Sequence, residues 1–167
     1  MSDERGSSDG GLLVASFHLG DAVFGLDAQQ VQEVAKMGDI TRVHHAPEDV
    51  VGIRNLRGRI VTVMDLRTRL KLGRVEENTA NRILIVDCQG EPIGLLVDRV
   101  ADTLSTRVED LSPAPPNLHG VQSRNLRGVC QGGGRLVGLL DHVALLQSEG
   151  SDTRNEGTAC EGAKPAS

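Results

Sequence analysis

Aromatic residues are almost absent from this chain of 167 residues, which has two Phe and neither Tyr nor Trp. Proteins that read single-stranded nucleic acid stack the bases on aromatic side chains, so this absence argues against that class. Positive charge is also in short supply, because 18 Lys and Arg stand against 23 Asp and Glu, for a net charge of −5. Without a basic field to attract phosphates, the composition favours a binder of proteins or small molecules over a nucleic-acid-binding protein.

Cysteine is scarce as well. Cys88, Cys130 and Cys160 form no CxxC pair and have no histidine at a metal-ligand spacing, so we expect free thiols without a metal or redox role. No apolar run approaches the roughly 18 residues that cross a membrane. Residues 1–11 lack the basic and apolar stretches of a signal peptide. The sequence therefore predicts a cytoplasmic protein with no direct membrane insertion.

No constellation of side chains indicates an enzyme. His44 and His45 are adjacent, so on an extended chain their imidazoles point to opposite faces and do not converge on one ion. The run Gly132–Gly134 lacks the GK[ST] ending of a phosphate loop and opens no helix, which makes it a hairpin tip. We therefore expect no catalytic residue, no metal site and no cofactor.

Glycine, by contrast, is abundant at 20 of 167 residues and indicates many tight turns around an aliphatic core. Residues 148–167 have no periodicity and little apolar content to offset the entropy of ordering them. We expect disordered tails over residues 1–11 and 148–167, and a single folded domain over 12–147.

The predicted elements are mostly strands. Leu13, Ala15, Phe17 and Leu19 alternate with polar residues, and Gly20-Asp21 forms a turn into a second strand. The other predicted strands, all short and apolar, cover residues 22–26, 60–64, 83–88, 93–97 and 136–140. The predicted helices, each preceded by an aspartate N-cap, cover residues 66–72 and 142–147, with one further turn at 27–30.

An internal repeat organises these elements. GLDAQQVQEV, starting at Gly25, aligns with GLLVDRVADT, starting at Gly94, at an offset of 69 residues. The acidic position recurs with the apolar ones, because Glu33 falls on Asp102.

A four-letter identity extends the alignment. Asn55-Leu56-Arg57-Gly58 recurs as residues 125–128, and six additional residues before the following aspartate are assigned to a glycine-rich hairpin around 131–135. Two repeats, about 12–73 and 81–147, follow from this alignment.

Arginine dominates the basic residues, since the chain has only three lysines. A guanidinium is a planar fork that suits carboxylates, although an arginine on a strand or loop can also be merely solvated. Arg57 stands out because it lies between Leu56 and Gly58, where the chain must turn between strands. Glu33 is its hypothesised acidic partner in the first repeat.

These segments resemble the CheW-like domain family, the bacterial chemotaxis coupling proteins. The resemblance rests on FHLGDAVFGLDAQQVQEV from Phe17, GIRNLRGRIVTVMDLRTRLKLG from Gly52, NRILIVDCQGEPIGLLVDRVADTL from Asn81 and NLRGVCQGGGRLVGLLDHVALL from Asn125. It implies a mainly β fold of two pseudo-symmetric five-stranded SH3-like β-barrels with a few short helices.

The resemblance also implies a role without chemistry, that of a non-enzymatic chemotaxis adaptor. Such a protein couples the cytoplasmic tip of methyl-accepting chemotaxis receptors to the regulatory domain of the histidine kinase CheA in membrane-associated arrays. The residues that match the family's receptor-binding positions are Val31, Glu33, Arg57 and Gly58. Those that match its kinase-binding region are Gly94, Val97 and Val100.

Two departures from the family pattern leave the pathway open. Arg54 stands where the family often has an apolar residue and Thr62 where it often has proline, so we expect a more basic receptor-facing surface. The alternative function is that of a coupling protein in a non-flagellar chemosensory pathway that controls twitching, development or gene expression. A small β-barrel that binds nucleic acid and an enzyme are the remaining, less favoured classes.

Overall fold

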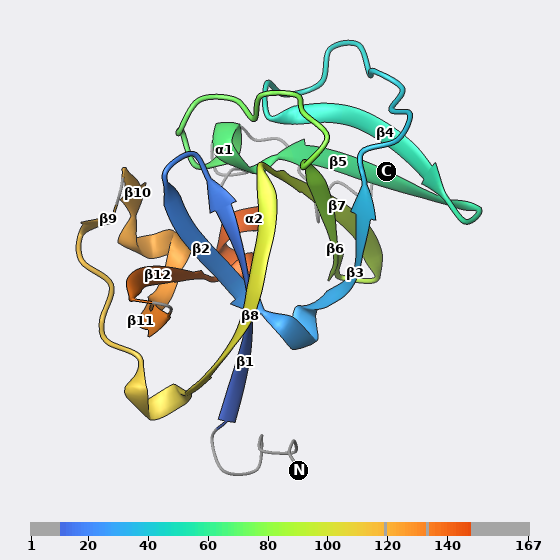
Figure 1. Ribbon diagram of the computed structural model, residues 1–167. Coiled ribbons are helices and arrows are strands. Elements are labelled where there is room, and N and C mark those ends of the chain that lie inside the picture. Colours follow the sequence, from blue (N-terminus) through green and yellow to red (C-terminus); the bar gives the residue numbers. More distant parts are fainter. Residues whose placement is uncertain (1–10, 119, 133, 148–167) are drawn as a thin grey trace.

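The computed structural model describes residues 11–118, 120–132 and 134–147 (Figure 1). The strands are β1 (Gly11–Leu19), β2 (Ala22–Asp27), β3 (Val31–Lys36), β4 (Val50–Leu56), β5 (Arg59–Asp65), β6 (Arg82–Cys88), β7 (Glu91–Val97), β8 (Arg99–Arg107), β9 (Asn117–Leu118), β10 (Val121–Gln122), β11 (Leu126–Gly132) and β12 (Arg135–Leu140). The helical segments are α1 (Leu66–Arg69), α2 (His142–Gln147) and the 3-10 turns η2 (Ala28–Gln30), η3 (Val108–Asp110) and η4 (Ser123–Asn125). The mainly β prediction is confirmed. The two predicted tails lie outside the described residues, except for Gly11, which begins β1.

Two five-stranded sheets and the two-stranded β9–β10 hairpin make up the described part of the domain. The first sheet has the strand order β11-β12-β2-β1-β8, and the second sheet has the order β3-β6-β7-β5-β4. Both sheets bury residues on both faces, as the consecutive buried residues of β7 and β12 show. The expected number of strands is confirmed for both sheets, and their two-sided burial is consistent with SH3-like barrels.

Each sheet takes strands from both halves of the chain, and the two sheets follow the same plan. Antiparallel pairing of β1 with β2 corresponds to that of β6 with β7, and parallel pairing of β12 with β2 corresponds to that of β5 with β7. Leu139 lies opposite Gly25 in the first sheet, and Val63 lies opposite Gly94 in the second. The repeat that aligns Gly25 with Gly94 is therefore confirmed by strand order and register.

The repeat assignment of the four-letter identity is wrong. The hairpins β4–β5 and β11–β12 have the same register, and residues 55–58 form the tip of the first. The last residues paired in the second hairpin are Gly132 and Arg135, which correspond to Leu56 and Arg59 of the first. The segment 125–128 instead enters β11 and corresponds to residues 49–52.

The additional residues of the second repeat are therefore not in that hairpin. They lie between β8 and β11, where the β9–β10 hairpin has no counterpart between β3 and β4. Pairing supports this placement, because the isolated bridges Thr41–Ile53 and Ser112–Val129 occupy equivalent positions in the two sheets. Register is set by which faces are buried, and a four-letter identity does not determine it.

The predicted alternation along β1 is wrong in its first half. Leu12 and Val14 are buried, whereas Leu13 faces solvent and is 52% exposed. The pairing of β1 with β8 shifts between Ala15 and Phe17, which lie opposite Thr103 and Val100, so the extra residue of this β-bulge lies in β8. Within β1 the buried side changes at Ser16 and Phe17, which are both buried, so the prediction holds only from Phe17 onward.

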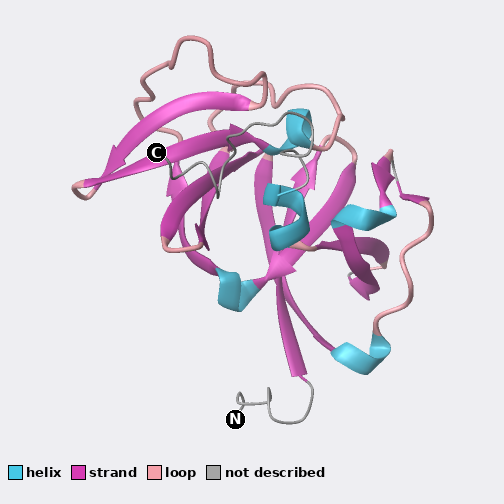
Figure 2. Cartoon of the chain, turned by 180° about the vertical axis from the view of Figure 1, so that it is seen from behind, coloured by secondary structure: helices cyan, strands magenta, loops and turns pink. Residues whose placement is uncertain are grey.

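One apolar core lies between the two sheets. It gathers Phe17 and Phe24 from the first sheet and Leu84 and Leu95 from the second, together with residues of both helices. Seen from behind, α2 lies near the middle of the domain, with the β4–β5 hairpin reaching out to one side (Figure 2). Because both sheets share this core, neither is expected to be stable alone.

Helix α1 is shorter than predicted and is linked to α2. Asp65 caps it by accepting a hydrogen bond from Thr68 N at 3.1 Å, but the helix ends at Arg69 and not at Leu72. The buried Arg69 guanidinium pairs with Asp49 Oδ2 at 2.7 Å and donates to Leu145 O in α2 at 2.9 Å. The other predicted caps, Asp27 for η2 and Asp141 for α2, are confirmed.

Gly25 and Gly94 allow neighbouring strands to approach closely, which generates a stability prediction. A Cβ on Gly25 would lie 2.3 Å from Val14 Cγ1, and a Cβ on Gly94 would lie 2.6 Å from Ile83 Cγ2. Gly25→Ala should lower the free energy of unfolding in urea by about 1–3 kcal/mol through overpacking. Adding Val14→Ala removes the atom that clashes, so the double variant should lose less than the sum of the two single variants. Strict additivity would contradict this account.

Candidate functional site

Arg57 and Gly58 form the two-residue tip of the β4–β5 hairpin. Their φ angles are +56° and +84°, the backbone conformation that such a turn requires at both positions. Asn55 Oδ1 accepts a hydrogen bond from Gly58 N at 2.9 Å and closes the turn. The sequence expectation that the chain turns at Arg57 is confirmed, and the turn projects the arginine away from the sheet.

The same turn chemistry recurs elsewhere in the chain. Asp87 accepts from Gly90 N at 3.2 Å in the β6–β7 turn, and Asn117 accepts from Gly120 N at 2.9 Å in the β9–β10 turn. The second NLRG segment makes no such turn, and Asn125 Oδ1 has no hydrogen-bond partner among the described residues. Identical letters thus have different structures, and only the first copy presents its arginine at a hairpin tip.

Glu33, on the edge strand β3, lies within hydrogen-bonding distance of the arginine at this tip. The pairing of β3 with β6 shifts between Val31 and Glu33, so a bulge redirects the side chains at this point. Glu33 Oε1 accepts a hydrogen bond from Arg57 Nη1 at 2.7 Å, and the two form an ion pair. The hypothesised pairing of Glu33 with Arg57 is therefore confirmed, and Val31 lies beside it, partly buried against the core.

The Glu33–Arg57 pair is open to solvent. The Arg57 side chain is 76% exposed and that of Glu33 is 25% exposed. An ion pair this exposed contributes only about 0.2–1 kcal/mol to stability. A non-glycine residue at positive φ adds a cost of its own. The pair therefore contributes little to the stability of the fold, and it suits the presentation of an oriented guanidinium to a partner.

Two exposed aliphatic residues lie near the pair in sequence, although Val34 directly follows Glu33 and points to the other face of β3. Val34, the residue after Glu33, is 47% exposed, and Ile60, two residues after Gly58, is 57% exposed. We name Ile60, together with Val31, Glu33, Arg57 and Gly58, the hairpin-tip surface. Such a mixture of charge and exposed aliphatic area is typical of a protein-binding surface.

Besides Arg57, three of the five arginines between positions 54 and 69 make hydrogen bonds or ion pairs within the protein. Arg54 donates to Lys36 O, Arg67 donates to Leu72 O at 3.1 Å, and Arg69 pairs with Asp49. Arg57 and Arg59 remain exposed. Arg54 is expected to make the receptor-facing surface more basic, and its guanidinium bonds to Lys36 O at the end of β3.

The expected kinase-binding residues are placed unevenly. Val97 is fully buried in β7, and Gly94 is buried beneath Ile83. Neither has the surface that a direct contact with a partner needs, so both are packing residues in this structure. Val100, on the edge strand β8, is 38% exposed and lies opposite Phe17. Of the three, Val100 alone is accessible.

Chemically reactive groups are few in the described part of the chain. No three His, Cys, Asp or Glu side chains there are grouped to hold a metal ion. Cys130 is a free, buried thiol whose pKa is raised by burial, whereas Cys88 is disulfide-bonded, so the expectation of a free thiol is wrong for Cys88. Cys160 lies outside the described residues. Burial, and after it Arg99 and Arg135, lower the pKa of His18.

None of the helices in residues 11–118, 120–132 and 134–147 has the length and apolar character needed to cross a membrane.

Comparison with known proteins gives a consistent result. A sequence model of the CheW-like domain matches residues 13–150. "Chemotaxis protein CheW" of Klebsiella aerogenes is 32% identical over 133 residues, 80% of each chain, and its Rhizobium meliloti namesake is 30% identical over 142 residues, 85% of this chain and 92% of that protein. "Protein FrzA" of Myxococcus xanthus is 28% identical over 134 residues, 79% of this chain and 83% of that protein. The crystal structure of the scaffolding protein TtCheW from Thermoanaerobacter tengcongensis superposes with a TM-score of 0.75 and 29% identity, over 81% of this chain and 88% of that chain.

The exposed pair generates a second stability prediction. Arg57→Gly removes the ion pair but suits the positive φ, so its free energy of unfolding should stay within about 1 kcal/mol of wild type. Arg57→Val places a β-branched residue at positive φ and should lose more than about 1 kcal/mol. Urea unfolding of both variants measures the difference. Equal losses would show that the Glu33 contact, and not the backbone, decides stability at this position.

Proposed function

The chain belongs to the CheW-like domain family, and on that premise we propose that it is a non-enzymatic adaptor that couples chemoreceptors to a histidine kinase. Its partners would be the cytoplasmic tip of methyl-accepting chemotaxis receptors and the regulatory domain of CheA. It would act in the cytoplasm, in receptor arrays at the membrane. The observation that carries the proposal is the Glu33–Arg57 pair at 2.7 Å, which joins two of the family's receptor-associated positions on one exposed surface.

The hairpin-tip surface is suited to reversible protein binding. One guanidinium nitrogen of Arg57 contacts Glu33, and the 76% exposed side chain leaves its other donors facing solvent. These donors can bind a carboxylate or backbone carbonyl of a partner. With no Tyr or Trp in the chain, the binding energy must come from arginine and from aliphatic side chains such as Ile60.

Two separate surfaces suit a protein that joins two partners. The hairpin-tip surface lies on the second sheet, and Val100 lies on an edge strand of the first sheet. We assign receptor binding to the former and kinase binding to the surface around Val100. Gly94 and Val97 would support that surface from inside by setting how closely the strands pack.

The second candidate is a coupling protein of a non-flagellar chemosensory pathway. Similarity to Protein FrzA, at nearly the same identity as to the chemotaxis proteins, keeps it open. The two candidates share the coupling role and differ in receptor and output. A deletion strain that swims but does not spread up an attractant gradient supports the first. Normal spreading with altered twitching, development or gene expression supports the second.

Charge reversal at the hairpin tip tests receptor binding. Arg57→Glu places a second carboxylate beside Glu33, so the two repel each other and the guanidinium donors are lost. We expect receptor co-sedimentation to weaken by about tenfold or more. Binding to CheA should stay within about twofold, because the kinase surface lies on the other sheet.

Arg107→Glu is the matched control. Arg107 is also exposed and ion-paired, with its Nε 3.2 Å from Glu109 Oε2, but it lies at the end of β8, on the first sheet. The Arg107→Glu variant should leave receptor co-sedimentation unchanged. Equal retention of receptor by wild type and Arg57→Glu would rule out receptor binding at the hairpin tip.

A further inference from the structure

The chain passes between the two sheets twice within the described residues. The first crossover leads from β2 through η2 to β3, and the second leads from β7 to β8. The second crossover is a single residue, Asp98, because β7 ends at Val97 and β8 begins at Arg99. Any change in the angle between the sheets must therefore alter the surroundings of Asp98.

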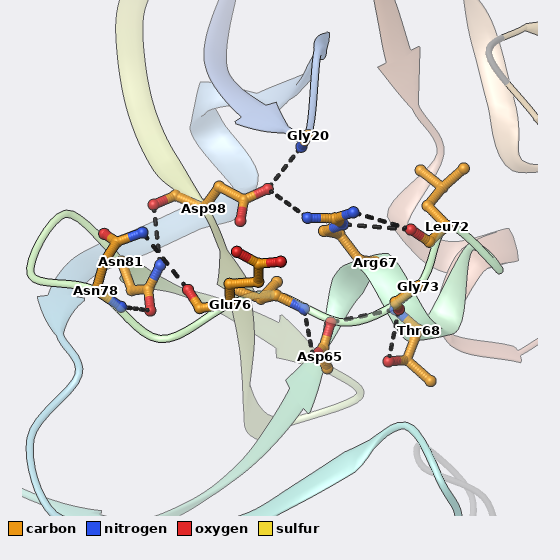
Figure 3. A network of polar contacts seen from close by, with 11 residues as sticks. Gly20, Asp65, Arg67, Thr68, Leu72, Gly73, Glu76, Asn78, Asn81 and Asp98 are labelled. Carbon is orange, nitrogen blue, oxygen red and sulfur yellow. Dashed lines mark hydrogen bonds and ion pairs between the residues drawn. The ribbon is translucent and has the colours of Figure 1, made fainter.

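Asp98 is bound to the first sheet by its backbone and by its side chain. Its N–H donates to His18 O in β1 at 3.2 Å. Its carboxylate Oδ2 accepts a hydrogen bond from Gly20 N in the β1–β2 turn at 2.6 Å (Figure 3). Gly20 is 78 positions away in sequence, so the contact closes a long loop of chain.

Asp98 is also bound to the second sheet and its helix. Its carbonyl accepts from Asn81 Nδ2 at 3.1 Å, next to the start of β6. Its Oδ2 lies 3.5 Å from Arg67 Nη1 in α1, which follows β5. The side chains of Arg67 and Asp98 are only 22% and 17% exposed. This ion pair is therefore less screened by water than the Glu33–Arg57 pair.

The partners of Asp98 are themselves held in place. Arg67 donates through Nε and Nη2 to Leu72 O at 3.3 and 3.1 Å, and Asn81 Oδ1 accepts from Asn78 N at 3.0 Å. Figure 3 shows these residues converging from the β1–β2 turn, from α1 and from the loop before β6. The network thus has few free rotations with which to follow a movement of Asp98.

Among the residues that the structure describes, the first crossover has no comparable network. Its aspartate, Asp27, accepts from Gln29 N at 3.0 Å within the same turn, and its ion pair with Arg127, at 3.6 Å, stays within the first sheet. Apolar contacts in the core between the sheets are non-directional, so directional contacts select the angle, and the Arg69 hydrogen bond from α1 to Leu145 O in α2 is one of them. Hydrogen bonds depend on direction as well as distance, so the contacts of Asp98 can select this angle.

We propose that Asp98 is a positioning residue whose carboxylate fixes the angle between the two sheets. If the proposed function holds, on which this inference rests, the angle sets the position of the hairpin-tip surface on the second sheet relative to the kinase-facing surface around Val100 on the first. A receptor bound to the hairpin tip then moves or restrains the kinase through a rigid connection. Loss of the carboxylate leaves both surfaces intact and loosens the connection between them.

Solution NMR of the full chain tests the positioning role without any partner. In wild type, residual dipolar couplings of the backbone amides in both sheets should fit one alignment tensor. In Asp98→Ala the two sheets should require different tensors, and the Gly20 amide should exchange with solvent about tenfold faster. A single tensor with the wild-type sheet orientation in Asp98→Ala would overturn the proposal.

Asp87→Ala is the matched control. Asp87 also accepts from a turn amide, that of Gly90 at 3.2 Å, but both residues belong to the β6–β7 hairpin of the second sheet. The Asp87→Ala variant should speed exchange of the Gly90 amide with solvent, and one alignment tensor should still fit both sheets. If Asp98→Ala does not fold, Asp98→Asn removes the ion pair and Asn81→Ala removes the bond to the Asp98 carbonyl. A wild-type orientation in both of these variants would overturn the proposal equally.

Coupling assays separate this proposal from the proposed function. Asp98→Ala should co-sediment with receptor and bind CheA within about twofold of wild type, while receptor-dependent kinase activity changes about threefold or more. Full kinase coupling by Asp98→Ala, or a receptor-binding loss as large as that of Arg57→Glu, would contradict the positioning role. If Arg57→Glu keeps receptor binding while Asp98→Ala reorients the sheets, the proposed receptor site fails and Asp98 remains the residue that fixes the sheets.

Discussion

Parallel pairing between the two halves of the chain is the constraint on which the rest of the structure depends. Strand β12 pairs with β2, and β5 pairs with β7, so each sheet is completed by a hairpin from the other half. Gly25 and Gly94 lie in these pairings, and a side chain at either would meet a neighbouring strand. The exchange brings both sheets onto one core and leaves two crossovers, one of which is a single aspartate. The candidate receptor and kinase surfaces are consequences of this arrangement, because each is carried by a different sheet.

The arginines divide between two kinds of task. Arg69, with a side chain 7% exposed, and Arg67, 22% exposed, connect elements from inside the molecule. Arg57, 76% exposed, contributes little to stability and presents its donors to solvent. Both phenylalanines, Phe17 and Phe24, are fully buried, so no aromatic residue is available on the described surface to anchor a partner. A low aromatic content thus directs attention to the arginine at the hairpin tip.

Sequence reasoning predicted the local features well. The hairpins after Leu19 and Cys88 and the aspartate caps follow from residue types whose local geometry is restricted. The Glu33–Arg57 pair is a long-range contact that the sequence offered only as a hypothesis, and the structure confirms it. Sequence reasoning failed where register decided the outcome. The NLRG identity misaligned the second hairpin, and Leu13 faces solvent where the alternation placed it in the core. Neither the exchange of strands nor the role of Asp98 is visible locally, because both depend on contacts between residues far apart in sequence.

The two-sheet arrangement offers a direct test of the central claim, that receptor binding belongs to the hairpin tip of the second sheet alone. Ile60 and Leu136 occupy equivalent positions in the two hairpins, opposite Asn55 and Gln131, and are 57% and 38% exposed. A photoreactive amino acid placed at either position in cells reports which surface touches the receptor. The account predicts a receptor cross-link from position 60 and none from position 136. Equal cross-linking from both positions, or capture from position 136 alone, would contradict it.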